Sequence, residues 1–490
     1  MSKKDTTMTE VKNLIEVYHE KVAEIFGKIA KQKAREIGFE KRERKINATV
    51  FITSLICTVY TYGKITLSNI SSIARQIDKK NDASEQAFEK KFTKKAVEFI
   101  QAMFAIVMKE NIEGANAIIP LLSAFTAVYI LDSTTVSLPE SLKKQFPGSG
   151  GDASEAASKV YLLLDWLSGK YEAIKVMAGI KADQNMGKSF TRGKKAQALW
   201  LMDLGFWNLE LFSSIAAKAS YFISRLHGQT NLYIKEKRLI KFDLDKFLAI
   251  APRDRFFEFK VYLGVEEKLP SRLILVPVPK QAADERRRKL KLDYQKKGKT
   301  PSQKTLNRLD WNLFVTNTDI AVLPTSTIPI IYRIRWQVEL TFKLAKSDAQ
   351  LDETLSQKPN RVLCEFYARL IALILFNRLL CLLPQTLLHR ISYPKSWQKF
   401  KLVSLAFFSL LSSDLFVPFI QDFISYLQLR AKINKRIKDP YTIDLLAFTS
   451  LNPFSCFLTN PLAFSSSSVS YSIEPIFTYN YSFSFSALVA

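Results

Sequence analysis

Two short apolar runs that each end in an aspartate constrain the fold of this chain more than any other feature. Residues 127–131 (AVYIL) precede Asp132, and residues 198–202 (ALWLM) precede Asp203. Compact runs rich in aliphatic and aromatic residues predict buried strands, and residues 160–166 and 174–179 are two more candidates, joined by a turn at 168–170. Open sheets carry their chemistry at the carboxyl ends of strands, so both aspartates are candidate site residues.

A second pattern occupies residues 332–346. Tyr332, Arg335, Glu339 and Lys346 follow the spacing Y-x2-R-x3-E-x6-K. On one continuous helix, at about 100° per residue, these four side chains would lie within an arc of about 60°, with an apolar back. One carboxylate flanked by cations and a phenol suits a metal ion beside a phosphate backbone. The helix alone also allows a simpler interpretation, a surface ion pair between Arg335 and Glu339.

The spacing resembles the signature of bacterial cut-and-paste insertion-sequence transposases of the DDE class, specifically the IS-four group, and the resemblance covers roughly residues 65–400. It implies an α/β fold class: a ribonuclease-H-like mixed sheet with flanking helices, interrupted by a β-rich insertion and preceded by an all-α DNA-binding domain. It further implies that Asp132, Asp203 and Glu339 are the catalytic, metal-binding residues. Asp132 would bridge two Mg²⁺ ions, with Mn²⁺ as a substitute, while Asp203 and Glu339 would bind one each.

The same resemblance implies DNA contacts. Arg335 and Lys346 would bind phosphates, and Tyr332 would hydrogen-bond the backbone or pack against a sugar. Arg225 matches a position that contacts end DNA in the family. Trp311 corresponds to a tryptophan that stacks on a flipped base, but a buried strand tryptophan explains it equally well. The chain departs from the family by lacking the arginine that often follows the second aspartate.

Charge supports a polyanionic partner. The chain of 490 residues has a formal net charge of +25 and is 47% hydrophobic, which is typical of basic globular proteins rather than disordered ones. Residues 280–308 are especially basic, which predicts a contact with the DNA backbone or, alternatively, an exposed loop that aids solubility.

The N-terminal region predicts helices. Residues 10–48 have the pattern of one or two basic amphipathic helices. Residues 66–95 resemble a helix-turn-helix: a helix over 68–77, a polar break at 78–83, and a second helix from Ser84 that offers Gln86, Lys90 and Lys91 to DNA. An ordinary helical hairpin has the same pattern.

The predicted organisation has six parts. They are a helical DNA-binding domain (1–125), the first part of the core (126–216), a β-rich basic insertion (217–320), the second part of the core (321–400), C-terminal helices (401–448) and an atypical tail (449–490). The tail has no Lys or Arg and alternates Ser with Phe and Tyr, which suggests a read-through or frame-shifted extension, or else a segment that docks on a partner.

The residues favour a cytoplasmic, reduced protein, and the resemblance to bacterial transposases implies association with the nucleoid. Four cysteines without a CxxC spacing and three histidines make zinc sites and disulfides poor interpretations. The N-terminus lacks the apolar segment of a secretory signal. The longest apolar stretch, 402–420, predicts a buried core helix rather than a membrane span.

The leading functional hypothesis is a DNA transposase that binds the terminal inverted repeats of an insertion sequence and catalyses cut-and-paste transposition. Its partners would be double-stranded repeat and target DNA, with a homodimer in the synaptic complex and no membrane. The alternatives are an inactive transposase remnant, a non-catalytic helix-turn-helix protein, or a ribonuclease-H-like nuclease with another role. The signature Tyr332, Arg335 and Lys346 argue against the last of these.

Overall fold

The computed structural model describes residues 3–42, 44–110, 119–150, 154–433, 441–451 and 479–480. The chain forms two compact units. Unit 1 comprises Met1–Ala117, Asp132–Ala182 and Trp336–Asn434, and unit 2 comprises Ile118–Leu131, Asp183–Arg335 and Lys435–Ala490. Of the atypical tail (449–490), only residues 449–451 and 479–480 are described. The predictions about its origin therefore concern residues that lie outside the described ones.

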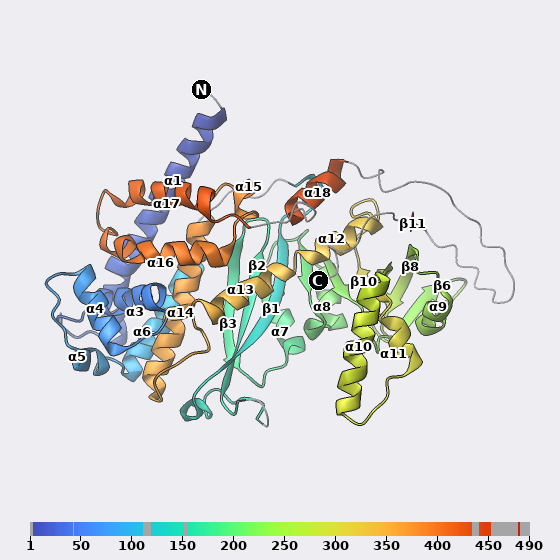
Figure 1. Ribbon diagram of the computed structural model, residues 1–490, viewed down its shortest axis with the longest axis horizontal. Coiled ribbons are helices and arrows are strands. Elements are labelled where there is room, and N and C mark those ends of the chain that lie inside the picture. Colours follow the sequence, from blue (N-terminus) through green and yellow to red (C-terminus); the bar gives the residue numbers. More distant parts are fainter. Residues whose placement is uncertain are drawn as a thin grey trace. The chain divides into compact units, whose positions relative to one another are not determined.

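The helices of unit 1 come from both ends of the chain (Figure 1). The N-terminal ones are α1 (Lys3–Glu24), the π-helical turn η1 (Ile25–Ile29), α2 (Ala30–Ile37), α3 (Ala48–Tyr62), α4 (Leu67–Ile77), α5 (Glu85–Glu89) and α6 (Lys94–Lys109). The later ones are η3 (Glu140–Leu142), α13 (Trp336–Ser347), α14 (Pro359–Leu380), α15 (Gln385–Leu388), α16 (Tyr393–Ser409) and α17 (Phe416–Arg430). The basic helices predicted at 10–48 are confirmed as far as Ile37, and the next helix begins only at Ala48. Ser84 starts α5 as predicted, since its side chain accepts a hydrogen bond from the amide of Ala87.

The core of unit 1 surrounds α14, which is buried on every side from Val362 to Leu380. A helix that is buried on every side needs neighbours on all faces; α3 and α6 pack directly on α14, and α16 packs on α3. The hydroxyl of Tyr60 on α3 donates to the carbonyl of Ala372 on α14. Residues 1–117 therefore share one compact unit with α13–α17, which differs from the predicted separate domain over 1–125.

The apolar stretch 402–420 is not one helix, so that prediction is wrong. Helix α16 ends at Ser409 and α17 begins at Phe416. Ser413 makes the break: its hydroxyl accepts from the amide of Leu415 and its carbonyl accepts from the amide of Phe416. Within the described ranges, no single helix is long and apolar enough to cross a bilayer; only α3 and α4 together reach that composition, and they are bent by 110°.

Unit 1 also contains three strands in the order β3-β2-β1. They are β3 (Lys170–Ala178), β2 (Ala157–Asp165) and the part of β1 (Val128–Ser137) that begins at Asp132. Strands β2 and β3 form the predicted hairpin. The turn between them is fixed because the Asp165 carboxylate accepts from Leu167 and Ser168. Strand β1 continues for five residues past Asp132, so the prediction that it ends there is wrong.

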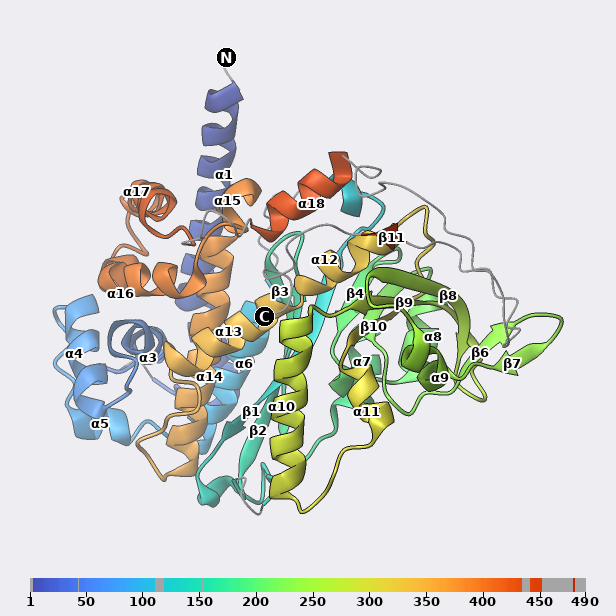
Figure 2. The same cartoon turned by 45° about the vertical axis from the view of Figure 1, so that its right-hand side comes forward.

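Unit 2 contains the remaining sheet, in the order β1-β4-β5-β10-β9-β8-β6-β7 (Figure 2). Its strands are the part of β1 up to Leu131, β4 (Leu199–Met202), β5 (Tyr221–Arg225), β6 (Leu232–Lys235), β7 (Leu239–Lys241), β8 (Arg255–Leu263), β9 (Leu269–Pro277), β10 (Trp311–Thr316) and β11 (Tyr479–Asn480), which pairs with β8. Its helices are η2 (Pro120–Leu122), α7 (Asp183–Thr191), η4 (Leu204–Phe206), α8 (Leu209–Ala216), α9 (Leu244–Ile250), α10 (Lys280–Lys296), α11 (Gln303–Arg308), η5 (Thr325–Thr327), α12 (Ile328–Arg333) and α18 (Thr442–Leu451).

The strand directions identify the sheet type. Strand β4 is parallel to β1 and to β5, whereas β5, β10, β9 and β8 are successively antiparallel. The orders β3-β2-β1 and β1-β4-β5 are those of a ribonuclease-H-like sheet, which confirms the predicted mixed α/β class. The β-rich segment between β4 and α12 is also present. Its basic stretch is helical, because α10 and α11 fill the connection between β9 and β10.

Candidate functional site

The two aspartates are placed by one register pair. Leu131 of β1 is paired with Met202 of β4, and Asp132 and Asp203 are the residues that follow these two partners in the chain. Both carboxylates are half-buried. Asp203 belongs to unit 2 and stands at the start of η4, whereas Asp132 belongs to unit 1 and accepts from the amide of Ser133 at 2.8 Å.

The segment 332–346 is not one continuous helix, so the predicted 60° arc of four side chains is wrong. Helix α12 ends at Arg333 and α13 begins at Trp336. Between them, the amides of Ile334 and Arg335 bond the carbonyls three residues earlier, Ile331 and Tyr332, and this tighter turn breaks the helical period. Tyr332 and Arg335 consequently belong to unit 2, and Glu339 and Lys346 to unit 1.

Tyr332 is buried against the sheet of unit 2. Its side chain is 7% exposed, and its ring lies 5.2 Å from that of Phe314 on β10. Its hydroxyl donates to the carbonyl of Met202, 3.2 Å away. Burial raises the pKa of Tyr332 to about 12, against the opposing effect of the Arg335 guanidinium, which lies over its ring. The phenol therefore stays protonated at neutral pH and acts as a donor at the residue before Asp203. Its predicted DNA contact stays a prediction.

Lys346 connects α13 to β1 within unit 1. Its Nζ donates to the carbonyl of Thr135 at 2.7 Å, three residues after Asp132 on the same strand. Glu339 lies seven residues earlier on α13, which is close to two helical turns, so the two side chains project from one side of that helix. Both are half-buried. A phosphate contact of Lys346 stays a prediction.

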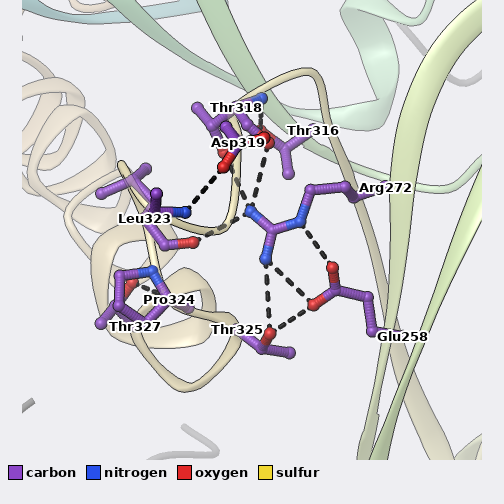
Figure 3. A network of polar contacts seen from close by, with 10 residues as sticks. Glu258, Arg272, Thr316, Thr318, Asp319, Leu323, Pro324, Thr325 and Thr327 are labelled. Atoms are coloured by element: carbon purple, nitrogen blue, oxygen red, sulfur yellow. Dashed lines mark hydrogen bonds and ion pairs between the residues drawn. The ribbon is translucent and has the colours of Figure 1, made fainter. Parts of the chain in front are cut away.

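A buried ion pair supports the approach to α12 (Figure 3). Arg272 of β9 and Glu258 of β8 are 8% and 2% exposed, and two parallel hydrogen bonds of 2.7 and 3.0 Å join them. The same guanidinium donates to the carbonyls of Thr318 and Leu323, in the loop that leads into α12. Nothing in the sequence pattern indicated this network, because its members are far apart in the chain.

Arg225 and Trp311 lie on opposite faces of the sheet. Arg225 ends β5, is exposed, and stands directly opposite Phe314 of β10. Trp311, three residues before Phe314, points to the other face, where its ring lies 5.8 Å from that of Phe257 on β8. Its side chain is 3% exposed. Its burial matches the alternative of a strand tryptophan, and the base-stacking role stays a prediction.

The helix-turn-helix candidate is shorter than predicted. Helix α5 has five residues, little more than one turn, and four residues separate its end from the start of α6. Gln86 and Lys90 are exposed, while the Lys91 ammonium lies 5.0 Å from the centre of the Phe39 ring, and burial lowers its pKa. Glu89, between them, is bound by Lys358 and by Arg361 at the start of α14. DNA binding by Gln86, Lys90 and Lys91 stays a prediction.

The predicted metal ligands come from separate parts of the chain. Among the residues that the structure describes, no three acidic, histidine or cysteine side chains form a group that could hold a metal ion. Asp132 and Glu339 lie in unit 1 and Asp203 in unit 2. Their chemistry suits Mg²⁺, which prefers a few carboxylate ligands and keeps several waters, and all three are accessible enough to be hydrated.

The chain is similar to known transposases over most of its length. It is 29% identical over 393 residues to the transposase for insertion sequence element IS231D of Bacillus thuringiensis subsp. finitimus, an alignment that covers 76% of this chain and 81% of that one. It is 28% identical over 437 residues to the transposase for IS231C of Bacillus thuringiensis subsp. berliner, covering 86% and 87%. The transposase for IS1151 of Clostridium perfringens is 29% identical over 360 residues, covering 70% and 76%.

A solved structure, the piggyBac transposase synaptic complex with hairpin DNA, matches 90% of this chain and 88% of its own with 10% identity and a TM-score of 0.44. The family model described as "Transposase DDE domain" matches residues 123–375. This span is more than half of the chain and includes Asp132, Asp203 and Glu339. The chain therefore belongs to the family of transposases with a DDE domain.

Proposed function

We propose that this DNA transposase binds the terminal inverted repeats of an insertion sequence, excises it by phosphodiester hydrolysis and joins it to target DNA, with Asp132, Asp203 and Glu339 as its catalytic carboxylates. Family membership gives the enzyme class, DNA cleavage and strand transfer, and a general dependence on divalent metal ions. The observation that supports the residue assignment is the register pair Leu131↔Met202, because an aspartate follows each partner on two parallel strands.

The carboxylates would hold two Mg²⁺ ions, with Mn²⁺ as a substitute: Asp132 binding both, and Asp203 and Glu339 one each. When bound, these ions supply an activated oxygen nucleophile and stabilise the leaving oxygen. The protein's own groups then orient the ligands and the DNA. Tyr332 holds the main chain next to Asp203, and Lys346 holds α13 on β1. Arg335 would bind a phosphate of the transposon end.

The large positive charge of the chain supports double-stranded repeat and target DNA as partners, since neutralising phosphates supplies most of the sequence-independent affinity. Cutting two ends together implies a homodimer in the synaptic complex. A cytoplasmic, nucleoid-associated location without membrane attachment is part of the same proposal. The second candidate function, a non-catalytic remnant, is favoured by the atypical composition of 449–490.

An end-cleavage assay tests the proposal. Labelled DNA that carries the terminal repeat of the element is incubated with the full-length protein and Mg²⁺, beside Asp132→Asn, Asp203→Asn and Glu339→Gln. The matched control is Glu236→Gln, which removes an exposed carboxylate in the turn between β6 and β7. We expect cleavage at the repeat boundary by the wild type and the control, DNA binding without cleavage by the three variants, and no cleavage in EDTA.

Binding without cleavage by the wild-type protein would support the remnant instead. A shortened chain that ends at Leu451, the last residue of α18, then shows whether the tail suppresses activity. Cleavage that survives Glu339→Gln would overturn the assignment of that residue and leave the enzyme class intact.

A further inference from the structure

Two arginine side chains lie on one face of the β5–β10 strand pair. Arg225 of β5 stands opposite Phe314 of β10, and register partners project to the same face. Asn312 lies two residues before Phe314 on β10, so its side chain is on that face too, diagonally across from Arg225. Such diagonal neighbours are within reach of long side chains.

Helix α10 adds a second arginine to this face. The Nη2 of Arg286 donates to the Oδ1 of Asn312 at 3.1 Å, which places the guanidinium over the end of β10. Arg286 is half-buried, and burial, followed by the nearby positive charge of Arg225, lowers its pKa. Two guanidinium groups are thus held close enough to repel each other.

Neither arginine of this pair forms an ion pair with a carboxylate within the part of the chain that the structure describes. Three other buried or partly buried arginines of unit 2 each bind a carboxylate. Arg287, the next residue on α10, binds Asp284 and Asp310. Arg308 binds Asp245, and Arg272 binds Glu258. A half-buried cation with only an amide partner beside a second cation is unfavourable unless an anion binds there.

The same face adjoins the candidate catalytic residues of unit 2. The ring of Phe314 contacts that of Tyr332, whose hydroxyl bonds the residue before Asp203. The charges of both Arg225 and Asp203 act on the Tyr332 phenol. An anion held by Arg225 and Arg286 would therefore lie near Asp203, which is where a transposase holds its DNA.

We propose that Arg225 and Arg286 jointly bind one backbone phosphate of the DNA substrate, with Asn312 orienting Arg286. This rests on the proposed function. It assigns a role to Arg286, which the signature motif does not include. Guanidinium groups suit the task because each offers two parallel N–H donors to phosphate oxygens, and a shared phosphate removes the repulsion between them.

The test measures binding of a fluorescent repeat duplex by anisotropy over a series of KCl concentrations. A plot of log of the association constant against log[KCl] has a negative slope, and losing one phosphate contact should make it less steep by about 1. Binding should weaken roughly tenfold near 0.1 M salt. We expect this for Arg286→Gln. Arg238→Gln is the matched control, because Arg238 is exposed in the turn between β6 and β7 and lies outside the basic stretch 280–308. Because the two arginines share one phosphate, Arg225→Gln/Arg286→Gln should bind little more weakly than either single variant.

Thermal unfolding without DNA separates this role from a structural one. Removing an uncompensated cation should leave the unfolding midpoint of Arg286→Gln unchanged or higher, whereas a purely structural contact with Asn312 predicts a lower midpoint. Arg286→Lys keeps the charge but not the paired donors, so it should keep the salt slope while lowering affinity. A wild-type slope in Arg286→Gln, or fully additive losses in the double variant, would overturn the shared phosphate.

The cleavage assay keeps the two proposals distinguishable. If the wild-type protein cuts repeat DNA and Arg286→Gln binds with an unchanged slope, the phosphate proposal fails alone. If the wild type does not cut, but its binding depends on Arg286 as described, the catalytic proposal fails and the phosphate site remains.

Discussion

The Tyr332 hydroxyl donates to the main-chain carbonyl of Met202, 3.2 Å away, and so fastens α12 to the end of β4. Met202 is the last residue of β4, and Asp203 follows it. A side chain of the signature motif thus acts on the backbone that carries a candidate catalytic carboxylate. The phenol is at once a packing group, through Phe314, and a hydrogen-bond donor.

Tyr332→Phe separates these two roles. We expect the ring to stay packed on Phe314 while the Met202 carbonyl loses its donor, which costs about 1 kcal/mol of unfolding free energy. The rate of end cleavage should fall while DNA affinity stays within about twofold, since the residue would position Asp203 rather than bind DNA. Urea unfolding, anisotropy and single-turnover cleavage measure the three quantities. Tyr62→Phe, at the exposed end of α3, is the control. A loss of affinity with normal cleavage of bound DNA would instead favour the DNA contact that the sequence predicted.

Trp311 can be tested in the same way. Its ring packs beside Phe257, and its Nε1 has no hydrogen-bond partner among the described residues, so phenylalanine can replace it without breaking a hydrogen bond. We expect Trp311→Phe to keep cleavage within a few-fold, and Trp311→Ala to lose about 3–5 kcal/mol of stability through the cavity that it leaves. Unfolding curves and cleavage rates check both. Loss of cleavage in a stable Trp311→Phe protein would support the base-stacking role.

The sequence predicted the features that depend on local pattern. The apolar runs before Asp132 and Asp203 became paired strands, and the two runs joined by the turn at 168–170 became the hairpin of β2 and β3. It could not predict the break at Ile334–Arg335, because the helical period of the residues continues through it. Two main-chain bonds to carbonyls three residues back decide the turn there.

The sequence likewise could not predict contacts between residues that are far apart in the chain. The apolar pattern of α14 indicates that the helix is buried, but not that α3 and α6, from the opposite end of the chain, cover it. Arg272 and Glu258 are ordinary charged residues of β-strands in the sequence, and only the pairing of β8 with β9 makes them partners. Arg286 is one of eleven basic residues in its segment, and its burial beside Arg225 distinguishes it.

His389 predicts a pH dependence of stability. In unit 1 its ring lies 4.2 Å from that of Trp166, and its buried Nε2 has no partner among the described residues. Burial lowers its pKa to about 4, below the ordinary value of 6.5. As the pH falls, His389 of the unfolded chain therefore becomes protonated near pH 6.5, whereas His389 of the folded protein stays neutral until about pH 4. The unfolding free energy is therefore unaffected by protonation of His389 above pH 6.5, and it decreases as the pH falls from 6.5 to about 4.

His389→Phe keeps a ring on Trp166 and removes the titration. The unfolding free energy of the wild type should fall relative to the variant by at most about 3 kcal/mol between pH 7 and pH 4. Urea unfolding of both proteins at several pH values measures the difference. Parallel pH profiles would show that the folded protein accepts the proton on His389 readily.

The Arg272–Glu258 pair should be far more sensitive than exposed pairs of the same kind. Glu258→Gln leaves the buried guanidinium without its counter-charge, and we expect a loss of about 3 kcal/mol in unfolding free energy. Asp254→Asn, which breaks the exposed pair with Arg255, is the control and should cost less than about 1 kcal/mol.

The double variant Glu258→Met/Arg272→Met separates the stability of the pair from its role in positioning the loop. It removes both charges, so most of the stability should return, but the carbonyls of Thr318 and Leu323 still lose their donor. Amide exchange in the loop before α12 should therefore stay fast, and cleavage should stay slow, in a protein that is otherwise stable. Restored cleavage in the double variant would show that the ion pair stabilises the sheet without positioning α12, whereas slow cleavage with normal DNA binding would connect this buried pair, through the loop and Tyr332, to Asp203.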